Sequence, residues 1–139
     1  MKDGGKMNRE ILFKAKREDN GEWVEGYYLN VVKINHFICT GKIKLNGAVK
    51  GILAPEMYAI DPDTICQYTG LTDKNGEKIW ENDILDCGMK LRVSWHHFKA
   101  SWVLSKKGWM YNHFFGESVE PEDVEVFGNI FDNAELLEG

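Results

Sequence analysis

The sequence has 139 residues, a length that suits one domain or two small ones. Hydrophobic residues make up 43% and charged residues 28%, with 17 basic against 22 acidic side chains and a formal net charge of -5. This is the composition of a folded domain, and its acidity argues against a protein that coats duplex DNA. No apolar run approaches the roughly 20 residues of a membrane-spanning helix, and residues 1–6 lack the apolar stretch of a signal peptide. We therefore expect a cytoplasmic protein with no membrane partner.

The cysteines and the acidic residues are unevenly spread. Cys39, Cys66 and Cys87 are an odd number with wide gaps, which favours reduced, mostly buried thiols over a disulfide framework. Eight carboxylates and no Lys or Arg lie between Glu117 and Glu138, a pattern typical of a solvated acidic surface.

The N-terminal part predicts a β-hairpin. Residues 1–6 offer nothing to bury and are expected to form a disordered leader. From Arg9 to Arg17 apolar and polar residues alternate as in a strand, and residues 19–21, Asp-Asn-Gly, predict a turn. The aromatic run 23–29 then reads as the returning strand.

The next fifty residues are also β-rich. Residues 31–40 favour a strand followed by turns at Gly41 and at 46–47, Asn-Gly. Between residues 51 and 68, Pro55 and Asp61-Pro62-Asp63 interrupt the apolar pieces, so this stretch is predicted to be a meander or connector.

The C-terminal half begins with a strong turn signal at Asp73–Gly76, where Gly76 supplies a permissive φ. Short strands and a closing helix are expected after it, at residues 84–87, 91–95, 100–104 and 124–127, and at 134–138 with an N-cap at 132–133. The pattern as a whole predicts a mainly β fold: an N-terminal β-region over 7–64, a small barrel over 65–139 and a short C-terminal helix, packed as one unit.

The candidate catalytic and metal-binding residues are few. His96 and His97 are adjacent, so on a strand they would point to opposite faces and would not share a metal ion. Glu81 and Asp83 would share a face if extended, as a paired acid and base must, but fixing the entry to the next strand is the favoured interpretation. Neither a nucleophile elbow nor a phosphate loop occurs, and no cofactor is predicted.

Two surfaces are candidates for binding. Trp95, His97 and Lys99 would lie on one face of an extended segment, and Lys14, Lys16 and Arg17 would add a basic edge, as in barrels that bind nucleic acid. Five Trp, five Tyr and seven Phe are many for this length. They indicate either an aromatic core or an interface, including one between copies of the chain.

The central stretch QYTGLTDKNGEKIWENDI, residues 67–84, closely resembles the hallmark of the YopX family of phage and prophage proteins. Residues 9–16 with 21–26 are similar to the family's opening, and residues 126–133 to its closing element. Asn82 stands where the family usually has Gly, and Asn tolerates left-handed backbone geometry. The residues expected to determine the fold within this motif are Tyr68, Gly70, Leu71, Asp73, Asn75, Gly76, Ile79, Trp80 and Asp83.

The resemblance implies an SH3-like barrel and a phage or prophage setting, and it implies no established activity. The leading hypothesis is therefore a non-catalytic module that binds an unidentified host or phage protein, or itself as a homo-oligomer. A nucleic-acid-binding barrel is the alternative, and a small enzyme using Glu81 and Asp83 is a third hypothesis.

Overall fold

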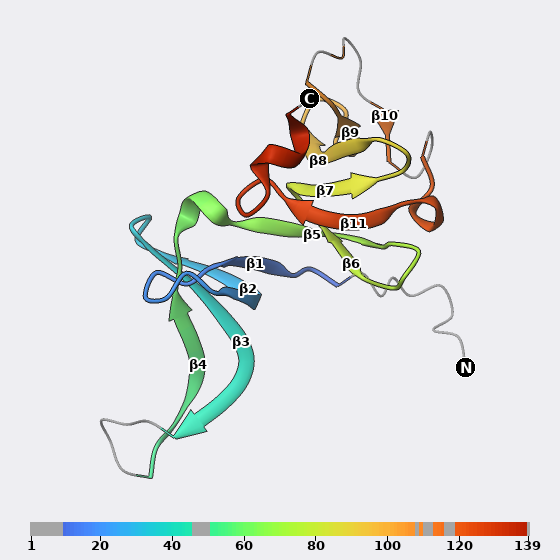
Figure 1. The fold of residues 1–139 in the computed structure, drawn as a ribbon. Helices are drawn as coiled ribbons and strands as arrows, with labels where there is room; N and C mark the ends of the chain where they lie inside the picture. The colour runs from blue at the N-terminus through green and yellow to red at the C-terminus, as the bar shows by residue number, and fades with distance from the viewer. Residues whose placement is uncertain (1–9, 46–50, 108, 110–112, 116–118, 139) are drawn as a thin grey trace, which may run out of the picture. The chain divides into compact units, whose positions relative to one another are not determined.

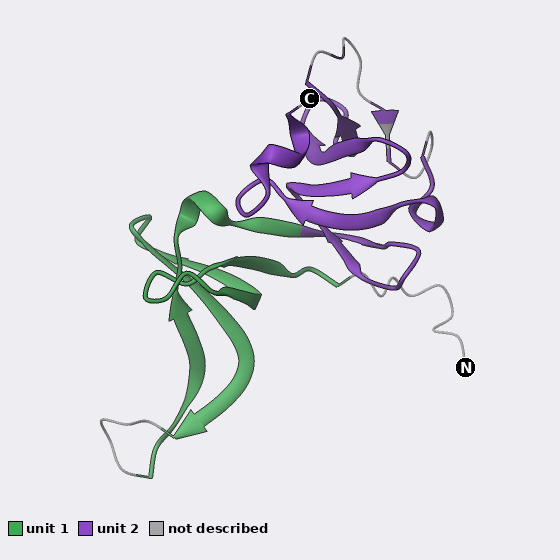
Figure 2. Cartoon of the chain, in the orientation of Figure 1, with its two compact units in different colours: residues 1–67 green, residues 68–139 purple. Residues whose placement is uncertain are grey.

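The computed structural model describes residues 10–45, 51–107, 109, 113–115 and 119–138. The chain divides into two compact units, unit 1 (residues 1–67) and unit 2 (residues 68–139), which are coloured separately in Figure 2. The sequence had suggested a division between residues 64 and 65. The predicted leader, residues 1–6, and the predicted turn at 46–47 lie outside the described residues.

Unit 1 is an antiparallel sheet. Its described elements are β1 (Phe13–Lys16), β2 (Trp23–Val31), β3 (Asn35–Leu45), β4 (Leu53–Ala59), the 3-10 helix η1 (Pro62–Thr64) and the first two residues of β5 (Cys66–Thr72) (Figure 1). The strands follow the order β4-β3-β2-β1, with Cys66 and Gln67 beside β1. Its core is small: Ala15, Ile38 and Ile60 are buried, and Phe13, Val24, Tyr28 and Ile65 pack against them.

The predicted hairpin is present as β1 and β2. At its turn the Arg17 N–H donates to the Glu22 carbonyl at 2.8 Å, and the Asn20 side chain accepts from the Glu22 N–H at 2.9 Å. Gly21 has a φ of 73°, which a glycine adopts without strain.

Residues 51–68 were predicted to form a meander or a connector; residues 53–59 form strand β4, antiparallel to β3, which fits the meander and not the connector. Pro55 lies within this strand, opposite Ile43 of β3. β4 ends the order of strands, and an edge strand tolerates a residue that lacks an N–H. The turn expected at Gly41 is also wrong. Strand β3 continues through Gly41, and the register of its pairing with β4 shifts between Cys39 and Ile43.

Unit 2 holds the larger core. Its described elements after β5 are β6 (Lys78–Trp80), β7 (Asp83–Asp86), β8 (Lys90–His96), β9 (Ser101–Ser105), β10 (His113–Phe114), η2 (Pro121–Asp123), β11 (Glu125–Asn129) and η3 (Ala134–Leu137). Residues 68–72 of β5 pair with β6, and the remaining strands form an antiparallel sheet in the order β10-β9-β8-β7-β11. The buried core residues are Ile79, Leu85, Leu91, Val93, Leu104, Phe115 and Val124.

The prediction of a mainly β fold is confirmed: the described strands form antiparallel sheets, without closing into a barrel. At the C-terminal end, residues 134–137 form one 3-10 turn, and the Asn133 side chain makes no capping hydrogen bond. Within the described ranges no helix has the length and apolarity to cross a bilayer.

Candidate functional site

One face of the unit 1 sheet is apolar across three neighbouring strands. Residues directly opposite each other on paired strands share a face, and residues two apart along a strand share it too. The register pairs Tyr27 with Cys39, Leu29 with Phe37 and Val31 with the polar Asn35. On β4 the opposed residues are Ala59, Met57, Pro55 and Leu53. We call the resulting set the outer face: Tyr27, Leu29, Val31, Phe37, Cys39, Ile43, Leu45, Leu53, Pro55, Met57 and Ala59.

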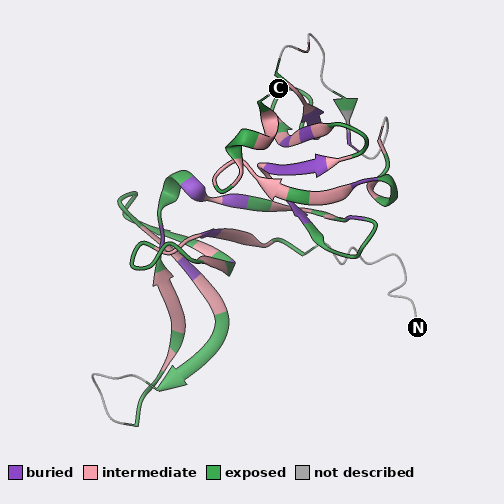
Figure 3. Ribbon diagram, viewed as in Figure 1, coloured by how far each residue is buried: buried purple, intermediate pink, exposed green. Residues whose placement is uncertain are grey.

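The outer face is open to solvent. Ile43, Leu45 and Leu53 are 68%, 70% and 64% exposed, and Tyr27, Leu29 and Val31 are exposed as well. The opposite face of the same strands carries Ile38, which is fully buried. Around Ile38 the sheet is thus apolar on both faces, and Figure 3 shows the exposed stretch along the far half of β3.

The far ends of β3 and β4 form a two-stranded arm, Ile43–Leu45 paired with Leu53–Pro55. β2 pairs with residues 35–39 of β3, so it does not extend along the arm. An isolated two-stranded ribbon is marginally stable in water. Contiguous exposed apolar surface of this kind marks an interaction site in soluble proteins.

Next to the arm, on the opposite face of the sheet, polar side chains pair with one another. The Tyr58 hydroxyl donates to Glu56 Oε1 at 2.5 Å, and the Thr40 hydroxyl donates to Glu56 Oε2 at 2.7 Å. The hydrogen bond to Glu56 raises the pKa of Tyr58, and those from Tyr58 and Thr40 lower the pKa of Glu56. Both shifts favour the ionised carboxylate and the protonated phenol.

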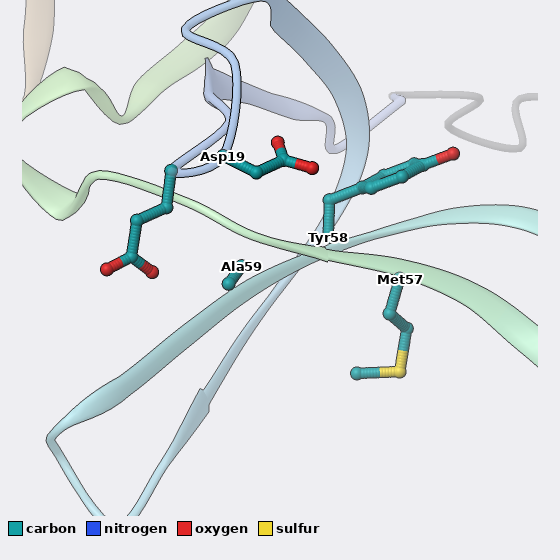
Figure 4. Close-up of a pocket in the computed structure, with 5 residues that line it drawn as sticks. Asp19, Met57, Tyr58 and Ala59 are labelled. Atoms are coloured by element: carbon teal, nitrogen blue, oxygen red, sulfur yellow. The ribbon is translucent and has the colours of Figure 1, made fainter.

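A shallow pocket of about 330 Å³ lies beside this cluster, lined by Glu18, Asp19, Met57, Tyr58 and Ala59 (Figure 4). Arg17 forms an ion pair with Asp19 at 2.7 Å, and its guanidinium lies 4.1 Å from the centre of the Tyr58 ring. The hydrogen bond from Arg17 lowers the pKa of Asp19. Arg17 and Asp19 are therefore engaged with each other beside the pocket.

The predicted basic edge is divided by the structure. Lys14 and Lys16 lie over the Trp23 ring, with Nζ 4.6 Å and 5.5 Å from its centre. Arg17 is on the opposite side of the strand, paired with Asp19. Only the two lysines therefore remain together.

The extended geometry expected for Trp95, His97 and Lys99 is wrong beyond His96, where β8 ends. Residues 97–100 form a turn, in which the Lys99 N–H donates to His96 Nδ1 at 3.2 Å and Ala100 has a φ of 48°. Trp95 instead meets Trp102 edge to face at 5.0 Å.

Asp73 organises the central turn of the family-like motif. Its Oδ1 accepts from the N–H groups of Asn75 and Glu77 at 2.8 and 2.9 Å, and its Oδ2 accepts from the Val126 N–H at 2.9 Å. The Gly76 N–H closes the turn on the Asp73 carbonyl at 3.0 Å, and Gly76 has a φ of 80°. The carboxylate thereby joins the turn to the last strand, β11.

The other motif residues support the same region. Ile79 and Trp80 are buried, Tyr68 packs on Trp80 with ring centres 5.4 Å apart, and Leu71 packs on the unit 2 core. Gly70 has a φ of 88° where the β5–β6 register shifts.

Asp83, the partner of Glu81 in the enzyme hypothesis, is almost fully buried. Its Oδ2 accepts from the Trp80 N–H at 2.8 Å, which is the turn-fixing role favoured from the sequence. Asn82 has a φ of 70°, the left-handed geometry expected of it. No group of three or more His, Cys, Asp or Glu side chains able to hold a metal ion occurs among the described residues.

Sequence reasoning missed the outer face. It weighed aromatic residues as the surface for an interface, whereas most of the exposed side chains that gather here are aliphatic. The available signal was the period-two alternation of residues 37–45 and 53–59, in which both faces contain apolar residues.

The comparisons with known proteins agree with this architecture. The chain is similar to the crystal structure of protein EF1440 from Enterococcus faecalis, with a TM-score of 0.60 and 23% sequence identity over 93% of this chain and 99% of that one. No curated protein matches the chain.

The family model described as YopX protein matches residues 12–138, from the first strand to the closing 3-10 turn. The match therefore includes the Asp73 turn and strand β11, whose Val126 N–H donates to the Asp73 carboxylate. On this evidence the chain belongs to the YopX family.

Proposed function

We propose that this protein is a non-catalytic protein-interaction module and that the outer face is its binding surface. The observation that carries the proposal is the continuous apolar face on β2, β3 and β4, exposed at Ile43, Leu45 and Leu53. Burying such side chains stabilises a complex by about 1.5–3 kcal/mol for each one fully covered.

The strain at the β2–β3 turn supports the same function. Val32 and Lys33 have φ angles of 53° and 63°, and Val32 and Ile34 are 76% and 77% exposed. A β-branched residue is costly in this region of backbone space and gains nothing from exposure. A partner that buries the Val32 and Ile34 side chains would account for apolar residues at this strained, exposed turn.

The proposal also covers the biological context of the protein and the fold type of unit 2. We infer a cytoplasmic accessory protein of a phage or prophage, from the resemblance of the hallmark motif to that family. An SH3-like character of unit 2 is supported by its short antiparallel strands around one core and by the return of β11 beside β7.

The test is site-specific photo-crosslinking in bacterial cells that produce the full chain. A photoreactive phenylalanine analogue at Leu53 is expected to give a protein adduct. The same analogue at Phe98, an exposed apolar position in unit 2, is the matched control and is expected to give none. Equal yields at the two positions, or no adduct at Leu53, would contradict the proposal.

Nucleic-acid binding is the second candidate, and the pair Lys14 and Lys16 over Trp23 favours it. It predicts affinity for single-stranded probes that falls steeply with salt. Loss of that affinity in the double variant Lys14→Ala/Lys16→Ala would support it, and no mobility shift at low salt would exclude it.

A further inference from the structure

We propose that the outer face binds the outer face of a second copy of this chain, so that two sheets pack face to face in a two-fold dimer. The inference rests on the proposed function, because it takes the outer face as the interaction surface and names its partner.

The chemistry of the outer face suits another sheet. None of its eleven side chains is charged, and the polar side-chain groups on this side of the sheet are the Tyr27 hydroxyl, the Cys39 thiol and, opposite Val31, the Asn35 amide. An apolar sheet face is complementary to another such face, packed about 10 Å away. Every copy of the chain carries one, so a two-fold interface needs no second kind of surface.

The charge distribution also permits self-association. The chain has a net charge of -5, and like-charged copies repel unless they meet through a neutral surface. The outer face is neutral. On the same side of the sheet, β1 and the start of β2 carry both signs, with Lys14 and Lys16 beside Glu25.

The size of the face is that of a small interface. β4 runs beside β3 over seven residues and β2 adds a third strand over five. With strands about 4.8 Å apart and a rise of about 3.3 Å per residue, the projection is about 10 Å by 23 Å, widening to about 15 Å over about 16 Å of its length. The accessible area of a surface covered by side chains exceeds its projection. The face is therefore at the lower end of interface sizes, below the roughly 800 Å² that each partner contributes to a standard interface.

Addition of a strand to the edge of the sheet is the less favourable mode. β4 is the edge strand, and Pro55 lies in it without an N–H to donate. Natural edge strands use proline in this way to discourage edge-to-edge pairing. The available apolar area is on the face.

The first test measures the mass of the full purified chain by light scattering between about 1 µM and 100 µM, a range that brackets ordinary Kd values. We expect a dimer at the upper end. The variant Ile43→Lys/Leu53→Lys is expected to be a monomer throughout. Phe98→Lys, which places the same charge at an exposed apolar position of unit 2, is expected to dimerise like the unmodified chain.

The second test needs no substitution. Cys39 lies on the outer face, whereas Cys87 is exposed in unit 2 and serves as an internal reference. Modification of Cys39 by a thiol reagent is expected to slow at least threefold between the lowest and highest concentrations, with the rate at Cys87 unchanged.

The outcomes separate this inference from the proposed function. A monomer at 100 µM with a constant Cys39 rate overturns the self-pairing. The same result with a Leu53 crosslink to a different protein in cells overturns the self-pairing and supports the interaction module. Without any crosslink, both proposals fail. A dimer that persists in Ile43→Lys/Leu53→Lys, with Cys39 unprotected, also overturns the inference.

Discussion

Asp73 is the residue whose role is most fully accounted for by its contacts. It is only 6% exposed, and its two carboxylate oxygens accept three backbone hydrogen bonds. Burial alone would raise its pKa, but the N–H groups of Val126, Glu77 and Asn75 lower the pKa below its usual 3.8. The ionised carboxylate is thus the form that the fold selects.

Asp73→Asn is expected to lower the free energy of unfolding by about 1–3 kcal/mol, because the new amide NH₂ cannot accept and leaves a buried N–H unpaired. Urea denaturation would measure the change. Asp123→Asn, at an exposed carboxylate on η2, is the control and is expected to have little effect.

The same residue gives a pH dependence of known sign. Because the folded-state pKa of Asp73 is lower than the unfolded value, its stabilisation is fully present above about pH 4 and is lost as the pH falls through the folded-state pKa. The variant Asp73→Asn should show a shallower acid limb than the unmodified chain. Parallel limbs in the two proteins would contradict this assignment.

At the scale of the element, the β2–β3 turn is strained in a way that substitution can relieve. Val32→Asn is expected to stabilise the protein by about 1 kcal/mol, since Asn tolerates positive φ better than a β-branched residue does. Val32→Ala is the control, because alanine removes the branch but still resists the left-handed geometry. Equal stabilisation by both substitutions in thermal unfolding would show that the exposed valine side chain, rather than the backbone, is the cause.

Elements whose structure depends on neighbouring residues in the sequence were predictable. Elements whose structure depends on how strands pair with one another were not. The turn at Asp73–Gly76 follows from side chains within four residues of one another. By contrast, strand β4 accommodates Pro55 because β4 is at the edge of the sheet, where a residue without an N–H costs little. The sequence alone does not show that this strand is at the edge. β8 likewise ends at His96 with a turn that contains neither glycine nor proline.

The candidate site illustrates the same limit. Alternation in residues 37–45 indicates two apolar faces, but the register shift between Cys39 and Ile43 decides which side chains are neighbours across strands. Exposure also depends on which face covers the small core of Ala15, Ile38 and Ile60. The sequence therefore predicted an interaction module and pointed to Lys14, Lys16, Arg17, Trp95, His97 and Lys99, but it did not point to the outer face.

At the scale of the whole molecule, the proposed dimer links stability to concentration. Two chains that unfold from a dimer gain about 1.4 kcal/mol of stability for each tenfold rise in concentration. With the unfolding entropy of chains of this size, that corresponds to a rise in Tm of about 2 °C per tenfold.

Calorimetry of the full chain at three concentrations should show this rise, and Ile43→Lys/Leu53→Lys should have a Tm independent of concentration. Phe98→Lys should retain the dependence, because its site lies in unit 2 and outside the outer face. A Tm that does not vary in the unmodified chain would mean that its folded state does not depend on a second copy. The exposed apolar residues of the arm would then be stable in water without a cover, contrary to the argument from two-stranded ribbons.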